Sequence, residues 1–309
     1  MHIVISEFMD TGAVDLLRRD FQVLYEPDLV DRRADLLKAV AEADALIVRN
    51  RTRVDGEVLA AGRRLRAVGR LGVGLDNIDV PACRERGIHV LPATGANARA
   101  VAEYVVTSVL VLTRGVYHNS SQVAQGAWPR TAMSNGREVH GRTLGVVGFG
   151  GIGRMTARLA QGLDMRVVAY DPMLPGTDPV WRETQVEPVS LDALLAGADA
   201  VTLHIPLTEG TRKLIDGPRI AAMKDGAVLV NTARGGIVDE AALAQALRDG
   251  KLRGAAMDVF GEEPLPAGSP LAGAPNLILT PHVAGLSVEA NTRVSDMVAQ
   301  RVAAVLKQG

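Results

Sequence analysis

Short apolar runs and amphipathic segments alternate along most of the chain. The runs are bounded by turn residues and are typical of strands buried on both faces of a sheet. Between them, apolar residues recur at spacings of three and four, as in helices with one buried face. The expected strands are 2–6, 22–25, 45–48, 67–69, 89–91, 143–147, 166–170, 200–205, 227–231, 255–259 and 277–280. This alternation predicts an α/β protein with doubly wound parallel sheets.

A glycine-rich turn stands where a dinucleotide site requires it. The expected strand 143–147 leads into GFGGIG at 148–153, a G-x-G-x-x-G, and a helical pattern follows. Gly148 permits a tight turn, Gly150 lets the backbone approach a pyrophosphate, and Gly153 lets the helix lie close to the strand. The helix N-terminus offers unpaired N–H groups to the anion. The order of strand, turn and helix predicts a Rossmann domain that binds a dinucleotide.

Asp171 indicates which dinucleotide binds. It ends the next expected strand, 23 residues after Gly148, where a carboxylate accepts hydrogen bonds from the adenosine ribose hydroxyls. A carboxylate also repels a 2′-phosphate, and the following Pro172 and Met173 supply no cation. We therefore predict that the cofactor is NAD rather than NADP.

The elements divide into two expected domains. Residues 1–91 repeat the strand and helix pattern without a G-x-G-x-x-G, so we expect a flavodoxin-like domain that binds the substrate. Residues 94–99 have the composition of a hinge, and the last helix, 288–306, can fold back on the first domain. The predicted domains are a discontinuous substrate-binding domain, 1–98 plus 285–309, and an NAD-binding Rossmann domain, 99–284.

Composition narrows the class of protein. The chain has 309 residues, of which 47% are apolar, and a net charge of −1. The balanced charge gives no indication of binding to nucleic acid or a membrane surface. The one cysteine, Cys83, excludes a disulfide framework. We find no pattern of a signal peptide and no apolar run of transmembrane length, and we expect a cytoplasmic protein.

A long polar segment separates two regular parts of the second domain. Residues 117–141 follow an expected helix at 100–114 that is apolar on most faces, and they contain Trp128 and Pro129. An apolar anchor inside a long loop is typical of an ordered lid or of a subunit contact. We predict an arm that forms a homodimer through the NAD-binding domain.

Three polar residues follow expected strands of the second domain. Arg234 comes after strand 227–231, Glu263 after strand 255–259 and His282 after strand 277–280. Ligands of open parallel sheets bind beyond the carboxyl ends of the strands. A guanidinium for a substrate carboxylate, an imidazole acid for a carbonyl oxygen, and a carboxylate that favours the protonated acid form a set suited to carbonyl reduction.

The chain resembles the D-isomer-specific 2-hydroxyacid dehydrogenases over essentially its whole length. The matching motifs are RLGVGLDNID at 70–79, GANARAVAEYVV at 95–106, VGFGGIGR at 147–154, HIPLT at 204–208, NTARGGIVDEAAL at 231–243, AMDVFGEEP at 256–264 and TPHVAG at 280–285. The resemblance implies that Arg234, Glu263 and His282 are catalytic and that Glu263, which directly precedes the proline, is the partner of the histidine.

The resemblance and the glycine turn together give the predicted ligand-binding residues. The predicted NAD-binding residues are Gly148, Gly150, Gly151, Ile152, Gly153, Asp171, His204, Pro206, Thr208, Thr232, Ala233, Arg234, Asp258, His282 and Gly285. The resemblance also implies that the backbone of Val73 and Gly74, together with Arg234, contacts the substrate. We assign no residues to a metal.

The first domain offers a cue to the substrate in its arginines. Arg49, Arg51 and Arg53 follow strand 45–48 and share one face if the backbone stays extended, and Arg70 ends a second strand. With Arg70, Arg49 and Arg51 form a predicted site for a second anion of a small 2-hydroxy or 2-oxo acid. The alternative interpretation is a solvated basic turn.

Several substrates and one non-enzymatic role remain open. The arginine pattern is similar to that of phosphoglycerate dehydrogenases, while IVISEFMD and LIVRNRT look closer to the (S)-sulfolactate dehydrogenase branch. We favour 3-sulfolactate, with 3-phosphoglycerate as the alternative and hydroxypyruvate or glyoxylate reduction behind it. Formate or phosphite oxidation does not explain an arginine cluster. An NAD-sensing scaffold would need partner-docking surfaces or disordered tails, for which this compact sequence has no pattern.

Overall fold

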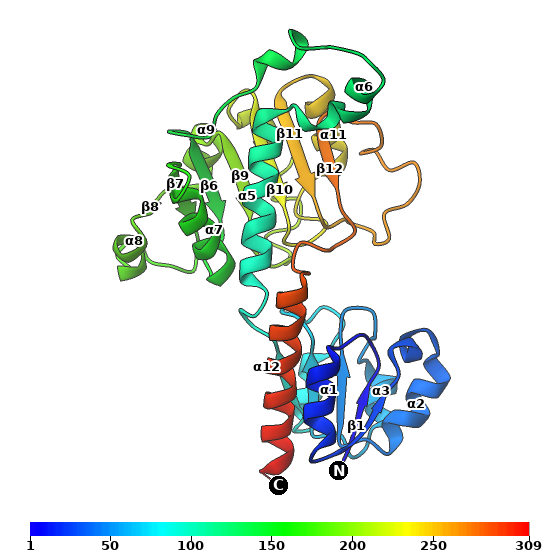
Figure 1. Ribbon diagram of the computed structural model, residues 1–309. Coiled ribbons are helices and arrows are strands. Elements are labelled where there is room, and N and C mark those ends of the chain that lie inside the picture. The colour runs from blue at the N-terminus through cyan, green and yellow to red at the C-terminus, as the bar shows by residue number, and fades with distance from the viewer. Residues whose placement is uncertain (309) are drawn as a thin grey trace. The chain divides into compact units, whose positions relative to one another are not determined.

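The computed structural model describes residues 1–308, which fall into two compact units. Unit 1 combines Met1–Asn97 with the segment that begins at Leu286, and unit 2 is Ala98–Gly285 (Figure 1). Unit 1 is therefore discontinuous in sequence. Gly309, the end of the predicted range 285–309, lies outside the described residues.

Unit 1 is built on a parallel sheet. Its described residues form five strands in the order β2-β1-β3-β4-β5. The strands are β1 (His2–Ile5), β2 (Gln22–Tyr25), β3 (Ala45–Val48), β4 (Ala67–Arg70) and β5 (His89–Pro92). Side chains alternate between the faces, so Ile3 and Ile5 enter one core and Val4 the other.

Helices cover both faces of this sheet. The core containing Ile3 is closed by α1 (Thr11–Arg18) and α12 (Val288–Lys307), the last helix of the chain. The core containing Val4 is closed by the 3₁₀ helix η1 (Pro27–Asp31) and by α2 (Arg33–Ala41), α3 (Gly56–Ala61) and α4 (Val80–Glu85). The return of α12 to unit 1 thus completes one of its two cores.

Unit 2 contains a larger parallel sheet. In its described residues seven strands have the order β12-β11-β10-β9-β6-β7-β8. They are β6 (Thr143–Val147), β7 (Arg166–Tyr170), β8 (Glu187–Pro188), β9 (Ala200–Leu203), β10 (Ala227–Asn231), β11 (Leu252–Met257) and β12 (Leu277–Leu279). The order reverses at β6, which has β7 on one side and β9 on the other. Such a reversal opens a crevice at the carboxyl ends of the strands.

The helices of unit 2 also form two layers. One layer comprises α5 (Ala98–Arg114), α7 (Gly151–Gln161) and α8 (Pro179–Thr184), and in it Phe149 stacks on Trp181 with ring centroids 4.9 Å apart. The other comprises α9 (Leu191–Gly197), α10 (Gly217–Ala222) and α11 (Glu240–Arg248). The predicted fold class, with two doubly wound parallel sheets, is confirmed.

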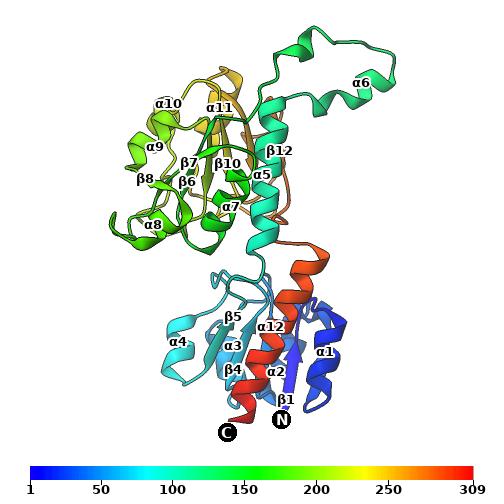
Figure 2. The same cartoon turned by 60° about the vertical axis from the view of Figure 1, so that its left-hand side comes forward.

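The bounds of some elements, and a few short elements, differ from the expectation where hydrophobic residues recur without a clear period. Helix α5 begins at Ala98, so the turn before it spans only 94–97 of the expected hinge. The short α8 and the two-residue β8 leave no periodic pattern to detect. The segment expected to be irregular holds α6 (Ser120–Ala124) between the 3₁₀ helices η2 (Tyr117–Asn119) and η3 (Ala132–Asn135), and it stands off the sheet of unit 2 (Figure 2). Every helix in the described part of the chain is too short or too polar to cross a bilayer.

Candidate active site

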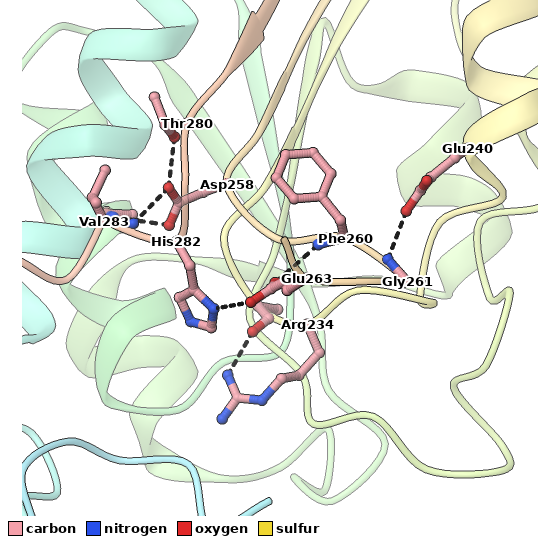
Figure 3. Close-up of polar contacts among 11 residues, drawn as sticks. Arg234, Glu240, Asp258, Phe260, Gly261, Glu263, Thr280, His282 and Val283 are labelled. Atoms are coloured by element: carbon pink, nitrogen blue, oxygen red, sulfur yellow. Dashed lines mark hydrogen bonds and ion pairs between the residues drawn. The ribbon is translucent and has the colours of Figure 1, made fainter. Parts of the chain in front are cut away.

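Three polar side chains lie beyond the carboxyl ends of neighbouring strands in unit 2 (Figure 3). Arg234 follows β10, Glu263 follows β11 and His282 follows β12. Because these strands are parallel and adjacent, the loops after them come out at one edge of the sheet. The structure brings together the guanidinium, carboxylate and imidazole that the sequence singles out.

His282 and Glu263 form a hydrogen-bonded pair. His282 Nδ1 lies 2.8 Å from Glu263 Oε2, and both side chains are partly exposed. The other carboxylate oxygen, Oε1, accepts a hydrogen bond from the Phe260 N–H at 3.0 Å. Glu263 is thus fixed by its own turn while it orients the imidazole. With the Nδ1 proton directed at the carboxylate, Nε2 is the ring nitrogen that can exchange a proton with a bound molecule.

Asn231 builds the turn that carries Arg234. Its Oδ1 accepts from the Ala233 N–H at 3.0 Å and its Nδ2 donates to the Arg234 carbonyl at 3.0 Å. Arg234 Nη1 donates to the Ala233 carbonyl at 2.6 Å. A Cβ at the next residue, Gly235, would lie 1.7 Å from the Phe260 carbonyl oxygen. Only glycine lets this turn lie directly against the turn that follows β11.

A buried carboxylate shapes the loop of His282. Asp258 is 1% exposed, and its Oδ1 accepts from Thr280 Oγ1 at 2.5 Å and from the Val283 N–H at 2.8 Å. Its Oδ2 accepts from the Ala284 N–H at 2.8 Å. His282 lies inside this loop with a φ of 56°, in the left-handed region that side chains seldom adopt. The hydrogen bonds that the Val283 and Ala284 N–H groups donate to Asp258 hold the backbone in that conformation.

Tyr104 extends this network to helix α5. Its hydroxyl lies 2.6 Å from Thr280 Oγ1. Since the single hydroxyl proton of Thr280 goes to Asp258, Tyr104 donates and Thr280 accepts. Burial raises the pKa of Tyr104, and the charge of Asp258 acts in the same direction. The sequence analysis missed Tyr104, because no local pattern links a helix residue to a loop 176 positions later.

The glycine turn after β6 is open on the side that a pyrophosphate would approach. Gly148 has a φ of 93°, and a Cβ there would lie 2.5 Å from the His204 carbonyl oxygen. A Cβ at Gly153 would lie 2.2 Å from the Gly148 carbonyl oxygen, whereas one at Gly150 or Gly151 would meet nothing within 4 Å. Helix α7 begins at Gly151, so its first N–H groups face this space.

Asp171 is held at the end of β7. Its Oδ2 accepts from the Phe149 N–H at 2.8 Å, and its Oδ1 accepts from the Met173 N–H at 2.9 Å. The first bond ties the carboxylate to the glycine turn. A carboxylate beside this turn fits a ribose with free hydroxyls and disfavours a 2′-phosphate.

His204 follows β9 and Thr232 follows β10, two adjacent strands on one side of β6. Thr232 Oγ1 is buried and has no hydrogen-bond partner among the described residues, so a ligand polar group fits beside it. His204 Nε2 lies 3.1 Å from Thr202 Oγ1, and burial lowers the pKa of His204 to about 4, which keeps the ring neutral at pH 7. His204 N–H donates to the Val147 carbonyl at 2.7 Å and joins the loop to β6.

The other predicted cofactor residues occupy the same loops. Pro206 and Thr208 are exposed after β9, and Thr211 Oγ1 donates to the Pro206 carbonyl at 2.7 Å. Ile152 packs on the core of α5 and α7, and Gly285 is the last residue of unit 2. The donor set, the open turn and the unpartnered hydroxyl fit NAD. Within the described residues no three His, Cys, Asp or Glu side chains cluster as metal ligands do.

In unit 1 the arginines after β3 do not share one face. The chain bends at residues 50–52 instead of staying extended, and this corrects the premise that aligned Arg49, Arg51 and Arg53. Arg51 pairs with Asp31 on the surface. Arg49 Nη2 donates to Asn291 Oδ1 at 2.8 Å, and its guanidinium lies 5.7 Å from the centre of the Phe8 ring.

Glu7 causes this bend, and the sequence analysis missed it. Its buried carboxylate accepts from the N–H groups of Arg49, Thr52 and Arg51 at 2.8, 2.9 and 3.2 Å. Burial lowers the pKa of Arg49, and Glu7 acts in the opposite direction. A glutamate that follows an apolar strand run gives no sign in sequence that it organises a loop 42 residues away.

The RLGVG loop after β4 carries the remaining predicted substrate residues. Arg70 Nη1 donates to the Leu71 carbonyl at 2.8 Å. Val73 is exposed and Gly74 is half-buried, so the backbone of both is within reach of a ligand that approaches this loop. Like the bend after β3, this loop lies at the carboxyl end of a central strand of unit 1.

Comparison with known proteins agrees with this geometry. The family profile described as "D-isomer specific 2-hydroxyacid dehydrogenase, NAD binding domain" matches residues 106–284. An (S)-sulfolactate dehydrogenase of Chromohalobacter salexigens is 58% identical over 95% of this chain and 94% of its own length. A D-3-phosphoglycerate dehydrogenase of Archaeoglobus fulgidus is 37% identical over 99% of this chain and 58% of its own. The crystal structure of TT0316 protein from Thermus thermophilus superposes with a TM-score of 0.90 at 36% identity, over 100% of this chain and 97% of that one. The chain therefore belongs to the D-isomer specific 2-hydroxyacid dehydrogenases and is an NAD-dependent oxidoreductase that acts on a 2-hydroxy acid.

Proposed function

We propose that Arg234, Glu263 and His282 catalyse the oxidation or reduction at C2 of a small anionic 2-hydroxy acid. NAD, when bound, supplies the nicotinamide that exchanges a hydride with this carbon. The hydrogen bond of 2.8 Å between His282 Nδ1 and Glu263 Oε2 carries the proposal. It leaves His282 Nε2 as the atom that gives a proton to the C2 oxygen or takes one from it.

The other two side chains have supporting roles. Glu263 fixes the tautomer and the orientation of the imidazole and stabilises the imidazolium that forms when the hydroxyl proton is taken up. Arg234 pairs with the C1 carboxylate of the acid, and a guanidinium is suited to this because it donates two parallel hydrogen bonds.

The cofactor residues are assigned by the same reasoning. The N–H groups around Gly150 and Gly151 receive the pyrophosphate, Asp171 accepts from the ribose hydroxyls, and the buried hydroxyl of Thr232 hydrogen-bonds the bound cofactor. The open turn and the unpartnered Thr232 Oγ1 support this assignment.

We favour 3-sulfolactate as the substrate. The relative named for this activity is 58% identical over nearly the whole chain. A second anion beyond the C1 carboxylate needs its own cation. Arg49 follows β3 and Arg70 ends β4, two adjacent inner strands of unit 1. Arg51 contributes to the local charge but is already paired with Asp31. The second candidate is 3-phosphoglycerate, which a relative at 37% identity is named for and which carries a tetrahedral anion in the same position.

A substrate panel tests this choice. NADH absorbance is followed at fixed pH with sulfolactate, phosphoglycerate, lactate, glycerate and hydroxypyruvate. We expect kcat/KM for sulfolactate to exceed that for lactate by about tenfold or more, as one charge-assisted hydrogen bond contributes about 1.5–3 kcal/mol. Arg49→Ala removes this preference, while Arg53→Ala, an exposed arginine in the same bend, leaves it intact.

The other outcomes of the panel are equally informative. A preference for phosphoglycerate that Arg49→Ala abolishes supports the second candidate. Equal or better activity on hydroxypyruvate contradicts a second anion site and makes the enzyme a general hydroxyacid reductase.

We also propose which unit binds each ligand and how two copies of the chain associate. Unit 1 binds the acid and unit 2 binds NAD. The bounds of these units differ by one residue at each boundary from the predicted domains, 1–98 plus 285–309 and 99–284. A second copy of the chain contacts the segment 117–141, where Tyr117, Val123 and Trp128 are exposed. A cytoplasmic location gives the enzyme access to the NAD pool on which turnover depends.

A further inference from the structure

The turn that carries Glu263 is held by a second carboxylate. Within residues 260–264, the Phe260 N–H donates to Glu263 itself, and the next amide, Gly261 N–H, donates to Glu240 Oε1 at 2.8 Å (Figure 3). Glu240 is the first residue of α11, whose N-cap is Asp239. The bond therefore joins the start of a helix on one face of the sheet to the loop after β11.

The residues of this turn have different surroundings. The Phe260 carbonyl touches Gly235 so closely that no Cβ fits between them. Gly261 and Glu262 line a cavity of about 470 Å³, together with Glu240, Leu265 and Pro266. The turn is thus packed against backbone at Phe260 and borders open space at Gly261, the residue whose N–H donates to Glu240.

We propose that Glu240 is a positioning residue for the reaction. By accepting from Gly261 N–H it fixes the turn in the conformation in which Glu263 reaches His282 at 2.8 Å. The negative charge is also favourably placed in the first turn of α11, where it faces the positive end of the helix dipole. The inference rests on the proposed roles of Glu263 and His282. Without Glu240 the turn shifts toward the cavity, and the carboxylate of Glu263 leaves the imidazole.

Two substitutions at Glu240 distinguish the effect of its hydrogen bond to the turn from the effect of its negative charge. Glu240→Ala removes the acceptor, and Glu240→Gln keeps a carbonyl oxygen at the same place without the charge. We expect Glu240→Ala to lower kcat about tenfold, because small misplacements of catalytic groups have large effects on rate. The KM values for NAD and acid change less than about twofold, since neither ligand is bound by this turn. Glu240→Gln restores most of kcat.

The pH dependence of kcat/KM and the local exchange of backbone amides test the positioning role, because a general loss of stability would not change them selectively. In Glu240→Ala the limb of the kcat/KM profile that reports the His282–Glu263 pair shifts, and the amides of 260–264 exchange faster with solvent. The matched control is Glu262→Gln, which removes the neighbouring charge in the same turn. This variant keeps the wild-type profile and exchange.

The results also distinguish a failure of the proposed function from a failure of the positioning role of Glu240. If His282→Ala retains turnover, the proposed function fails whatever Glu240 does. If His282 is required but Glu240→Ala has wild-type kcat and pH profile, only the positioning role is overturned. A lower melting temperature of Glu240→Ala with an unchanged profile likewise assigns Glu240 to stability and contradicts the proposal.

Discussion

The imidazole of His282 is oriented by atoms from several parts of unit 2. Glu263 comes from the loop after β11, while Asp258 at the end of that strand holds the two amides that follow the histidine. Tyr104 of α5 supports Asp258 through Thr280. An unfavourable backbone conformation at His282 is thus maintained by hydrogen bonds from buried groups, which is a common arrangement at functional sites.

At the scale of single residues, we predict that His282→Ala lowers kcat by about 10²–10⁴-fold, the usual contribution of a general acid–base residue. Steady-state kinetics with the preferred acid measure it. His140→Ala is the matched control, because His140 also faces a carboxylate, Asp164 at 3.6 Å, but lies on the surface. Near-normal turnover of His282→Ala, or an equal loss in His140→Ala, contradicts the assignment.

The site residues divide into those that the sequence reveals and those that it does not. Arg234, Glu263 and His282 lie in the loops that follow β10, β11 and β12, and short motifs mark them. Glu240 and Glu7 act on backbone amides of loops 21 and more than 40 residues away, so no local pattern points to them. The predicted alignment of Arg49, Arg51 and Arg53 requires an extended backbone, which the hydrogen bonds from the loop amides to Glu7 prevent.

At the scale of elements, hydrophobic periodicity identifies the buried strands and long helices well, because burial imposes the period. Elements without a buried face are less predictable. The two residues of β8 are exposed, and so is most of α6, which accounts for the absence of a clear signal in both. The segment of α6 also carries a large side chain toward solvent, since Trp128 is 79% exposed.

We predict that Trp128→Ala weakens self-association. Tryptophans at the centre of interfaces commonly contribute about 2 kcal/mol or more, so the dimer dissociation constant rises by about 30-fold or more. Sedimentation velocity over a range of concentrations measures it. Met173→Ser is the control, as Met173 is 85% exposed in unit 2 but lies outside the segment. A wild-type chain that is monomeric at micromolar concentration, or equal effects of both substitutions, rules out the arm.

At the scale of the whole molecule, the chain leaves unit 1 after Asn97 and re-enters it at Leu286. Helix α12 then covers the same face of the sheet as α1, and the Asp10 N–H donates to Ser295 Oγ across 285 positions. The predicted domains include this return, although the periodic pattern of an amphipathic helix does not by itself say which sheet the helix covers.

We predict that Val298→Ala destabilises unit 1 selectively. Val298 is fully buried against the sheet of unit 1, and removing its methyl groups costs about 1–2 kcal/mol. Hydrogen exchange resolved along the chain should show faster opening in 1–97 and 286–308 and little change in 98–285. Val288→Ala, at an 80% exposed site on the same helix, is the control. Equal acceleration in both units means that they open as one cooperative block.

The late position of α12 has a consequence for synthesis on the ribosome. Strands β1 to β5 emerge first, but the helix that covers one face of their sheet follows about 200 residues later. At a synthesis rate of about 5–20 residues per second, that face stays uncovered for roughly 10–40 s. Unit 2 is complete before then, so the nascent chain holds a finished domain beside an unfinished one. This interval is when the apolar surface of unit 1 is open to chaperones.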